Sequence, residues 1–461
     1  MYDLVIQNGT VVDFEKNEKY VADVGIKDGK IIDVGKCPES AKKVIDAEGL
    51  VVSPGFIDIH MHEETLGNTV DGDHYDIANY MLRMGVTTAV GGNCGNNRQD
   101  TDVFFGFIDK NGAPVNYLLF TGHNYLRNKV GLDAYGVATK SQIQKMRDMA
   151  KREIEEEGVI GISYGIEYSP AVTFEEMVSL SSDIGYDILL SAHYRSDADK
   201  ALEAINEMID ISRETRLPMQ ISHLGSCSAF GNMTEALELI QQAIDQGLSI
   251  QADCYPYDAF STRIGSAVFE EGCFERWNKS YDSVMLTEEP FKGMFCDENL
   301  FYKARKEYPN MLAVAFVMNE DEVIEAYRAP FVYVASDGLL NRSQGHPRAA
   351  GTFPRVLGRF VREYKALDFI DMLKKMTILP ARRLGLSNKG DIKPGMDADI
   401  AIFNADTIID RATFEEPTNP PEGIEYVIID GEIALEGDKV INSRLGRAIR
   451  RGELGGSTIK I

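Results

Sequence analysis

Side chains that can bind a metal ion recur at the ends of predicted strands: His60, His62, Cys94, His193, His223 and Asp337. Each alone is more often structural, so their recurrence at separate strand ends is what favours a metal site. His60 and His62 stand two residues apart, and the period of two in a strand points both imidazoles to one face. Imidazole and thiolate favour zinc. These six groups suit two ions, with the charged sulfur of Cys94 as the natural bridge.

Eight short apolar segments would position these residues: 55–60, 87–91, 116–120, 159–163, 187–191, 219–222, 249–252 and 331–335. Helical stretches such as 141–157 and 234–246 lie between them. This alternation over residues 54–387 predicts an α/β fold, a (β/α)8 barrel of the TIM type. Because barrel enzymes place their chemistry at the carboxyl ends of the strands, the candidate ligands should converge on one mouth. The longer segment 258–330 is predicted to be an insertion over that mouth.

The two ends of the chain have a different rhythm from the middle. Residues 1–53 contain short alternating segments, punctuated by Asn8-Gly9 and Asp28-Gly29, which are strong hairpin signals. Residues 388–461 show the same pattern of short strands. The ends are therefore predicted to form one small β-domain together.

Composition excludes several classes of partner. The 461 residues include 48 Lys and Arg against 72 Asp and Glu, a net charge of −24, which repels nucleic acid and anionic lipid but allows a small anionic substrate. No apolar run approaches the roughly 18 residues of a membrane helix, and the first residues carry no secretory pattern. The six scattered cysteines form no CxxC pair. We expect a cytoplasmic protein with a small-molecule substrate, and no pattern predicts its oligomeric state.

The segment 56–62, the later strand-end histidines and Asp337 resemble the amidohydrolase superfamily. Within it, the chain is most similar to the N-acyl-D-amino-acid deacylases, or D-aminoacylases. That similarity is carried by Gly-Asn-Cys-Gly at 92–95, by 161–170, by Tyr-Pro-Tyr at 255–257 and by Gly446-Arg447. It covers nearly the whole chain. It implies a metal-dependent barrel over 54–387 and a β-sandwich built from 1–53 and 388–461.

The resemblance also implies a role for each metal-binding side chain. Cys94, His193 and His223 would hold one tightly bound zinc ion. His60 and His62, together with Cys94, would hold a second ion that is often only partly bound. Asp337 would act as the general base on a metal-activated water and then as the acid that protonates the leaving nitrogen.

The resemblance assigns the substrate contacts as well: Arg348, Tyr255 and Ser261 to the substrate carboxylate, and Tyr168 to a wall of the pocket. A guanidinium suits a carboxylate through two parallel hydrogen bonds. The chain departs from the family at Gly225, where a Lys that reaches the same carboxylate is common. That change weakens the case for a free carboxylate and leaves stereospecificity, acyl group and side chain open.

Two other functions compete with deacylation of a linear amide. A cyclic amidase acting on a hydantoin- or dihydropyrimidine-like ring is one, although many such superfamily members bridge their metals with a carboxylated Lys on the fourth strand. No Lys lies near the end of that segment here, and Glu167, the nearest acidic residue, is not assigned as a ligand. A metal-free scaffold protein is the other, and relatives of that kind have usually lost ligands that this chain retains.

Overall fold

Nine parallel strands form a closed ring in the computed structural model, which describes residues 1–37, 40–67, 75–182, 184–185 and 188–455. One arc holds β6 (Phe56–Asp58), β7 (Val86–Gly91) and β8 (Asn116–Leu119). The other runs through β9 (Thr121–Gly122), β10 (Gly161–Gly165), β11 (Leu189–His193), β12 (Met219–Ile221), β13 (Ile250–Cys254) and β17 (Val332–Val334). The strand expected at 187–191 is observed from Leu189 onward, and Asp187 lies outside the described residues.

Two further contacts close the ring. β8 and β9 flank Phe120 and occupy one strand position, and Leu119 accepts a hydrogen bond from the Ile160 amide at 2.9 Å. At the seam, the Asp337 amide donates to the His60 carbonyl at 2.8 Å, and the His62 amide donates to the Gly338 carbonyl at 3.0 Å. The predicted (β/α)8 barrel is confirmed, with eight strand positions around one core.

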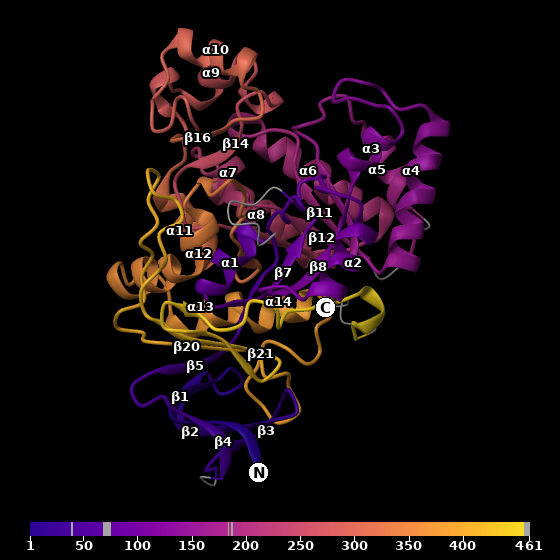
Figure 1. Cartoon of the computed structure of the whole chain (residues 1–461). Helices are drawn as coiled ribbons and strands as arrows, with labels where there is room; N and C mark the ends of the chain where they lie inside the picture. The colour runs from indigo at the N-terminus through magenta and orange to yellow at the C-terminus, as the bar shows by residue number, and fades with distance from the viewer. Residues whose placement is uncertain (38–39, 68–74, 183, 186–187, 456–461) are drawn as a thin grey trace.

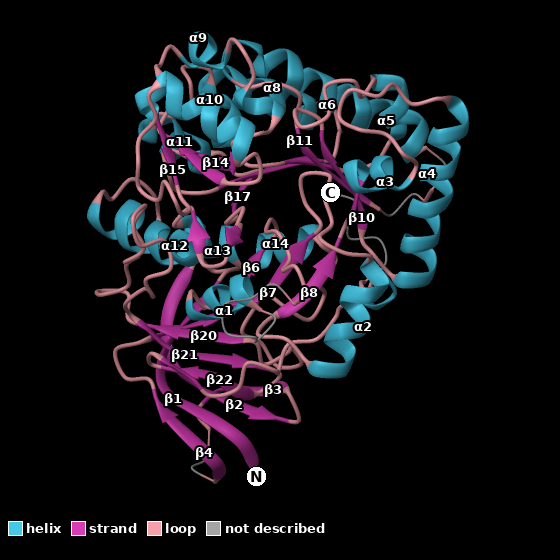
Figure 2. Cartoon of the chain, turned by 45° about the horizontal axis from the view of Figure 1, so that its top comes forward, coloured by secondary structure: helices cyan, strands magenta, loops and turns pink. Residues whose placement is uncertain are grey.

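Amphipathic helices surround the barrel (Figure 2). The ring includes α1 (Asp76–Arg83), α2 (Thr101–Asn111), α4 (Lys140–Arg152), α5 (Phe174–Ser181), α6 (Ala201–Thr215), α8 (Met233–Asp245), α11 (Glu320–Arg328), α12 (Arg348–Arg355) and α13 (Phe369–Met376). Side-chain caps begin several of them. The Thr173 hydroxyl, for example, accepts from the Glu176 amide at 3.1 Å and so satisfies one of the free amides at the start of α5. These helices bury their apolar faces against the strands.

Strands from both ends of the chain form one nine-stranded sheet at the base of the molecule (Figure 1). The amino-terminal strands are β1 (Tyr2–Asp13), β2 (Glu18–Lys27), β3 (Lys30–Gly35), β4 (Ala41–Asp46) and β5 (Val51–Pro54). The carboxyl-terminal strands are β20 (Ile400–Phe403), β21 (Ile424–Ile429), β22 (Glu432–Glu436) and β23 (Lys439–Val440). β5 pairs antiparallel with β20, and both halves contribute to one apolar cluster that includes Ile6, Val52 and Ile400. Residues 456–461 of the predicted second half lie outside the described residues.

A separate small lobe follows β13 at the top of Figure 1. It contains β14 (Phe260–Arg263), β15 (Val284–Leu286) and β16 (Leu312–Ala315) in an antiparallel sheet, with α9 (Cys273–Trp277) and α10 (Glu298–Glu307). The lobe has its own apolar cluster, and Val317 is the last residue of the lobe that belongs to it. α11, which also falls within the predicted insertion 258–330, packs instead against α8 and β17 as part of the barrel.

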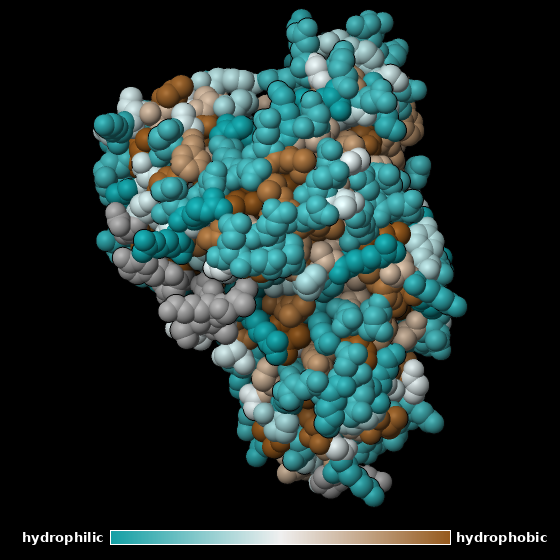
Figure 3. Space-filling model, turned by 180° about the vertical axis from the view of Figure 1, so that it is seen from behind, coloured by the Kyte–Doolittle hydropathy of each residue, from teal (hydrophilic) through white to brown (hydrophobic). Residues whose placement is uncertain are grey.

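Hydrophilic side chains cover most of the surface that is visible from behind, with smaller hydrophobic patches between them (Figure 3). Among the described residues, every helix is too short or too polar to cross a membrane.

Candidate metal centre

The structure brings the six predicted donors together at the carboxyl end of the barrel in two groups that share one thiol. The first group is His60, His62, Cys94 and Asp337, and the second is Cys94, His193 and His223. Within each group the donor atoms lie within 4.8 Å of one another, and all of these residues are buried. The sharing of Cys94 is the arrangement expected of a bridging ligand.

Unusual backbone geometry aims several of these side chains into the mouth. Cys94 (φ 51°), His223 (φ 33°) and Asp337 (φ 48°) adopt left-handed conformations, which non-glycine residues rarely do and which are often found at functional sites. In the loop that carries Cys94, Gly92 also has a positive φ of 73°, and a Cβ there would collide with the Phe120 carbonyl. Only glycine fits at that position, so the Gly-Asn-Cys-Gly motif fixes the loop that presents the thiol.

A buried carboxylate that the sequence analysis missed orients His60. The Asp253 Oδ1 lies 3.1 Å from His60 Nδ1 and accepts from the His223 amide at 2.8 Å, while Gln220 donates to its Oδ2 at 2.9 Å. His60 therefore presents Nε2 to the cluster, 3.3 Å from the Cys94 sulfur and 3.4 Å from Asp337 Oδ1. The only signal in the sequence was an acidic residue at the end of the predicted seventh strand. Many residues with a purely structural role occupy such positions.

The imidazoles of His193 and His223 are oriented in the same way. His193 Nε2 lies 2.7 Å from Glu167 Oε2, and its buried Nδ1 has no hydrogen-bond partner among the described residues. His223 Nδ1 contacts the Ser226 hydroxyl at 2.7 Å, which leaves Nε2 at 3.4 Å from the Cys94 sulfur. Metal-binding histidines characteristically engage one ring nitrogen in such a bond and leave the other to the ion. Glu167 is thus a support for His193 that the sequence pattern did not reveal.

The electrostatics of the cluster suit a divalent cation. Burial alone would raise the pKa of the Cys94 thiol, but the neighbouring imidazoles of His60 and His223 hold it well below its ordinary value. Burial opposes protonation of His193, yet Cys94 and Glu167 raise its pKa to about 10. Without a metal ion, protonated imidazoles therefore compensate the negative charge of the thiolate and the carboxylates. A metal ion can replace those protons, because thiolate and neutral imidazole are the forms that bind it.

Beside the donors, a buried guanidinium has free hydrogen-bonding capacity. One terminal nitrogen of Arg348 contacts Asp337 Oδ2 at 2.9 Å and donates to the Ser261 carbonyl at 3.0 Å. Its Nε and other terminal nitrogen have no partner in the described parts of the chain, nor do the Tyr255 and Ser261 hydroxyls. The guanidinium also lies over the Tyr255 ring, 4.6 Å from its centroid. Buried polar groups normally find partners, so these unused donors are available to a ligand.

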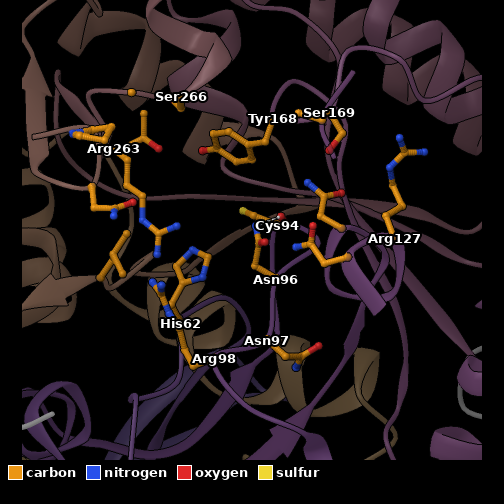
Figure 4. Close-up of a pocket in the computed structure, with 18 of the residues that line it drawn as sticks. His62, Cys94, Asn96, Asn97, Arg98, Arg127, Tyr168, Ser169, Arg263 and Ser266 are labelled. Atoms are coloured by element: carbon orange, nitrogen blue, oxygen red, sulfur yellow. Dashed lines mark hydrogen bonds between the residues drawn. The ribbon is translucent and has the colours of Figure 1, made fainter. Parts of the chain in front are cut away.

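An open cavity of about 480 Å³ leads to the donors and is shown in Figure 4. His62, Cys94, Tyr168, Asp337 and Arg348 all line it. The Tyr168 ring stands 4.5 Å from the His193 ring, which fits its predicted place as a wall.

Gly225 is not among the residues that line this cavity. It lies on the short helix α7 (Leu224–Ser228), where a Cβ would approach the Cys254 sulfur to 2.9 Å. The position that commonly carries Lys is therefore packed against Cys254 and Val323 of α11 in this chain and does not reach the cavity.

Comparisons with known proteins agree with this geometry. The amidohydrolase family model matches residues 43–254 and 301–435. A D-aminoacylase from Alcaligenes xylosoxydans xylosoxydans is 30% identical, over 98% of this chain and 98% of its own length.

Two solved structures superpose over almost the full length. An N-acyl-D-glutamate deacylase from Bordetella bronchiseptica, complexed with zinc and a phosphonate mimic of the tetrahedral intermediate, is 29% identical with a TM-score of 0.87, and the match covers 97% of this chain and 99% of that one. A D-aminoacylase with a binuclear metal centre, described as activated by one metal and attenuated by a second, is 29% identical with a TM-score of 0.88. That match covers 98% and 100% of the two chains.

Proposed function

The chain belongs to the amidohydrolase family, and on that premise we propose that it deacylates N-acyl-D-amino acids to a carboxylate and a D-amino acid. The observation that carries the proposal is a pair of donor groups sharing Cys94, directly beside a buried guanidinium with unused donors. The first part supplies the chemistry of a metal-dependent amide hydrolase. The second part supplies a place for the substrate carboxylate.

Zinc fits the donor set, which combines one thiolate with imidazoles. Cys94, His193 and His223 would hold one ion, and the orphaned Nδ1 of His193 supports that assignment. His60 and His62 would hold a second ion together with Cys94. When bound, zinc lowers the pKa of water and polarises a carbonyl group.

Asp337 would move the proton. Its Oδ1 faces His62 Nε2 at 3.1 Å, and Arg348 holds its Oδ2. Burial would raise its pKa, but the Arg348 guanidinium and the two imidazoles hold the pKa well below its ordinary value, so the carboxylate is an available base. Asp337 takes a proton from the attacking water as the new C–O bond forms. It returns that proton to the nitrogen as the C–N bond breaks.

Arg348, Tyr255 and Ser261 would orient the substrate through its α-carboxylate, and Tyr168 would close one side. Two free guanidinium nitrogens and two free hydroxyls can together satisfy both oxygens of that group. Fixing the carboxylate places the amide next to Asp337, because Arg348 contacts both sites.

Amine release from paired N-acetyl-D- and N-acetyl-L-amino acids, with zinc-loaded protein, tests this function. We expect release from the D-isomers, reduced at least a hundredfold in Asp337→Asn, the lower end of the usual range for loss of a general base. The variant should still bind zinc, which separates lost chemistry from lost metal. Turnover of a hydantoin with none of the acyl-amino acids would support the cyclic amidase instead. Protein that retains no metal after careful purification would support the scaffold alternative.

A further inference from the structure

Two arginines without an acidic partner line the mouth of the active-site cavity, Arg98 and Arg263. We propose that they form a second anion subsite, which binds an additional carboxylate carried by the substrate. The inference rests on the proposed deacylase function, in which Arg348 already holds the α-carboxylate. It narrows the substrate from acyl-amino acids in general to those that carry two negative groups.

Neither side chain makes a hydrogen bond or an ion pair within the part of the chain that the structure describes. Arg127, which lines the same cavity, behaves differently and pairs with buried Glu176 at 2.6 Å. Arg98 is half-buried and Arg263 is exposed at the rim. In a chain with 72 acidic residues against 48 basic ones, both guanidiniums are still left without an acidic partner and are free to bind a ligand. A ligand anion would supply the missing partner.

The position of Arg98 is fixed by the loop that also presents Cys94, four residues earlier. The Arg98 amide donates to Glu63 Oε1 at 2.7 Å, and the Gly92 amide donates to Glu63 Oε2 at 2.7 Å. The nearby carboxylate of Glu63 is therefore occupied by the main chain. Burial and the positive charge of Arg263 lower the pKa of Arg98 to about 10, although the charge of Glu63 works in the opposite direction. Arg98 and Arg263 line the same cavity, so an anion bound there could contact both guanidiniums.

Arg263 lies on the same strand as Ser261, which belongs to the proposed site for the α-carboxylate. It ends β14, in register with Leu312, and Ser261 stands two residues earlier on the same face. That spacing corresponds to about 7 Å along the strand. Figure 4 shows Arg98 beside His62, with Arg263 on the same side of the cavity and Arg127 on the other. The two carboxylates of a ligand would thus lie only a few bonds apart.

The second carboxylate can come from the amino-acid side chain or from the acyl group, and two pairs of uncleavable sulfonamides distinguish these sources. N-methylsulfonyl-D-glutamate is compared with N-methylsulfonyl-D-glutamine, and N-(2-carboxyethylsulfonyl)-D-alanine with N-propylsulfonyl-D-alanine. Binding to zinc-loaded protein is measured by isothermal titration. In at least one pair we expect the additional carboxylate to strengthen binding roughly ten- to a hundredfold, the usual effect of hydrogen bonds to a charged group.

Arg98→Gln and Arg263→Gln should each reduce that preference several-fold. Arg213→Gln, on the outside of α6 where Arg213 pairs with Asp210, removes the same charge and should preserve it. Absence of a preference in both pairs, or its persistence in both cavity variants, would overturn the subsite. If the preference holds while no N-acyl-D-amino acid is hydrolysed, the subsite stands and the proposed function falls.

Discussion

Glu167 determines which nitrogen His193 offers to a metal ion. Its carboxylate lies 2.7 Å from His193 Nε2, and Arg276 approaches its other oxygen at 3.8 Å. Replacing Glu167 by Ala leaves a buried ring N–H without an acceptor and frees the imidazole to turn. We predict a roughly 10- to 100-fold loss of zinc affinity in Glu167→Ala, measured by competition with a chelating dye.

Glu167→Gln is the matched control, because its amide oxygen can still accept the hydrogen bond. It should recover most of the affinity. Equal zinc affinity in wild type and Glu167→Ala would show that His193 is held by its packing alone.

The site residues that could be predicted from the sequence are those whose spacing along the chain follows the strand pattern. His60 and His62 stand two residues apart just after β6, and the remaining donors end or directly follow their strands, so a barrel brings them together without further knowledge. Asp253 and Glu167 carry no such pattern, because each orients a histidine that is distant in sequence. Asp253 stands 193 positions after His60, and Glu167 stands 26 positions before His193. Contacts of that kind become visible only when the strands are in register.

At the scale of elements, α4 continues into a π-helical turn, η1 (Glu153–Glu157), that buries a carboxylate. Glu153 is buried at 3% exposure, and its Oε2 has no partner among the described residues. Burial, together with the negative charges of Glu157 and Asp100, raises its pKa to about 7, although Thr121 works in the opposite direction. The folded protein therefore retains a proton that the unfolded chain has already lost.

This raised pKa makes the contribution of Glu153 to stability fall as pH rises from about 4.5 to about 7. Glu153→Gln removes the ionisation, so its advantage over wild type should grow by about 1–2 kcal/mol between about pH 5.5 and about pH 8. Urea unfolding at each pH measures the difference. Glu156→Gln, at an exposed position of the same turn, should show no such trend. A constant difference for Glu153→Gln would mean that Glu153 ionises normally when folded.

The elements that the sequence predicted are those with local periodicity, namely the buried strands and the amphipathic helices. The lobe after β13 was harder to predict from the sequence, because β14 pairs with β16 across about fifty intervening residues. Within 258–330, α11 has the same amphipathic pattern as any surface helix, and its burial against α8 depends on the barrel being formed. Tertiary packing, and not local preference, decides where the lobe ends and the barrel resumes.

At the scale of the whole molecule, a net charge of −24 coexists with a cavity lined by arginines. The global charge bears on long-range encounters with polyanions, whereas the cavity acts over a few ångströms, where individual guanidiniums dominate. Composition therefore argues against polyanionic partners but cannot describe the pocket.

The proposed metal donors come from residues 60 to 337, so an ion held by them would connect several strands of the barrel. An ion that binds only the folded state stabilises it by about 4 kcal/mol when its concentration is a thousand times Kd. For a chain of 461 residues this corresponds to a fall in Tm of roughly 4 °C after chelation.

Calorimetry of chelated and zinc-reloaded protein measures this fall in Tm. Zinc should restore Tm, whereas magnesium, which prefers oxygen ligands, should not. Cys94→Ala, which removes the shared ligand, should make Tm nearly insensitive to the chelator. Identical melting of chelated and reloaded wild type would contradict a tightly bound ion at this site.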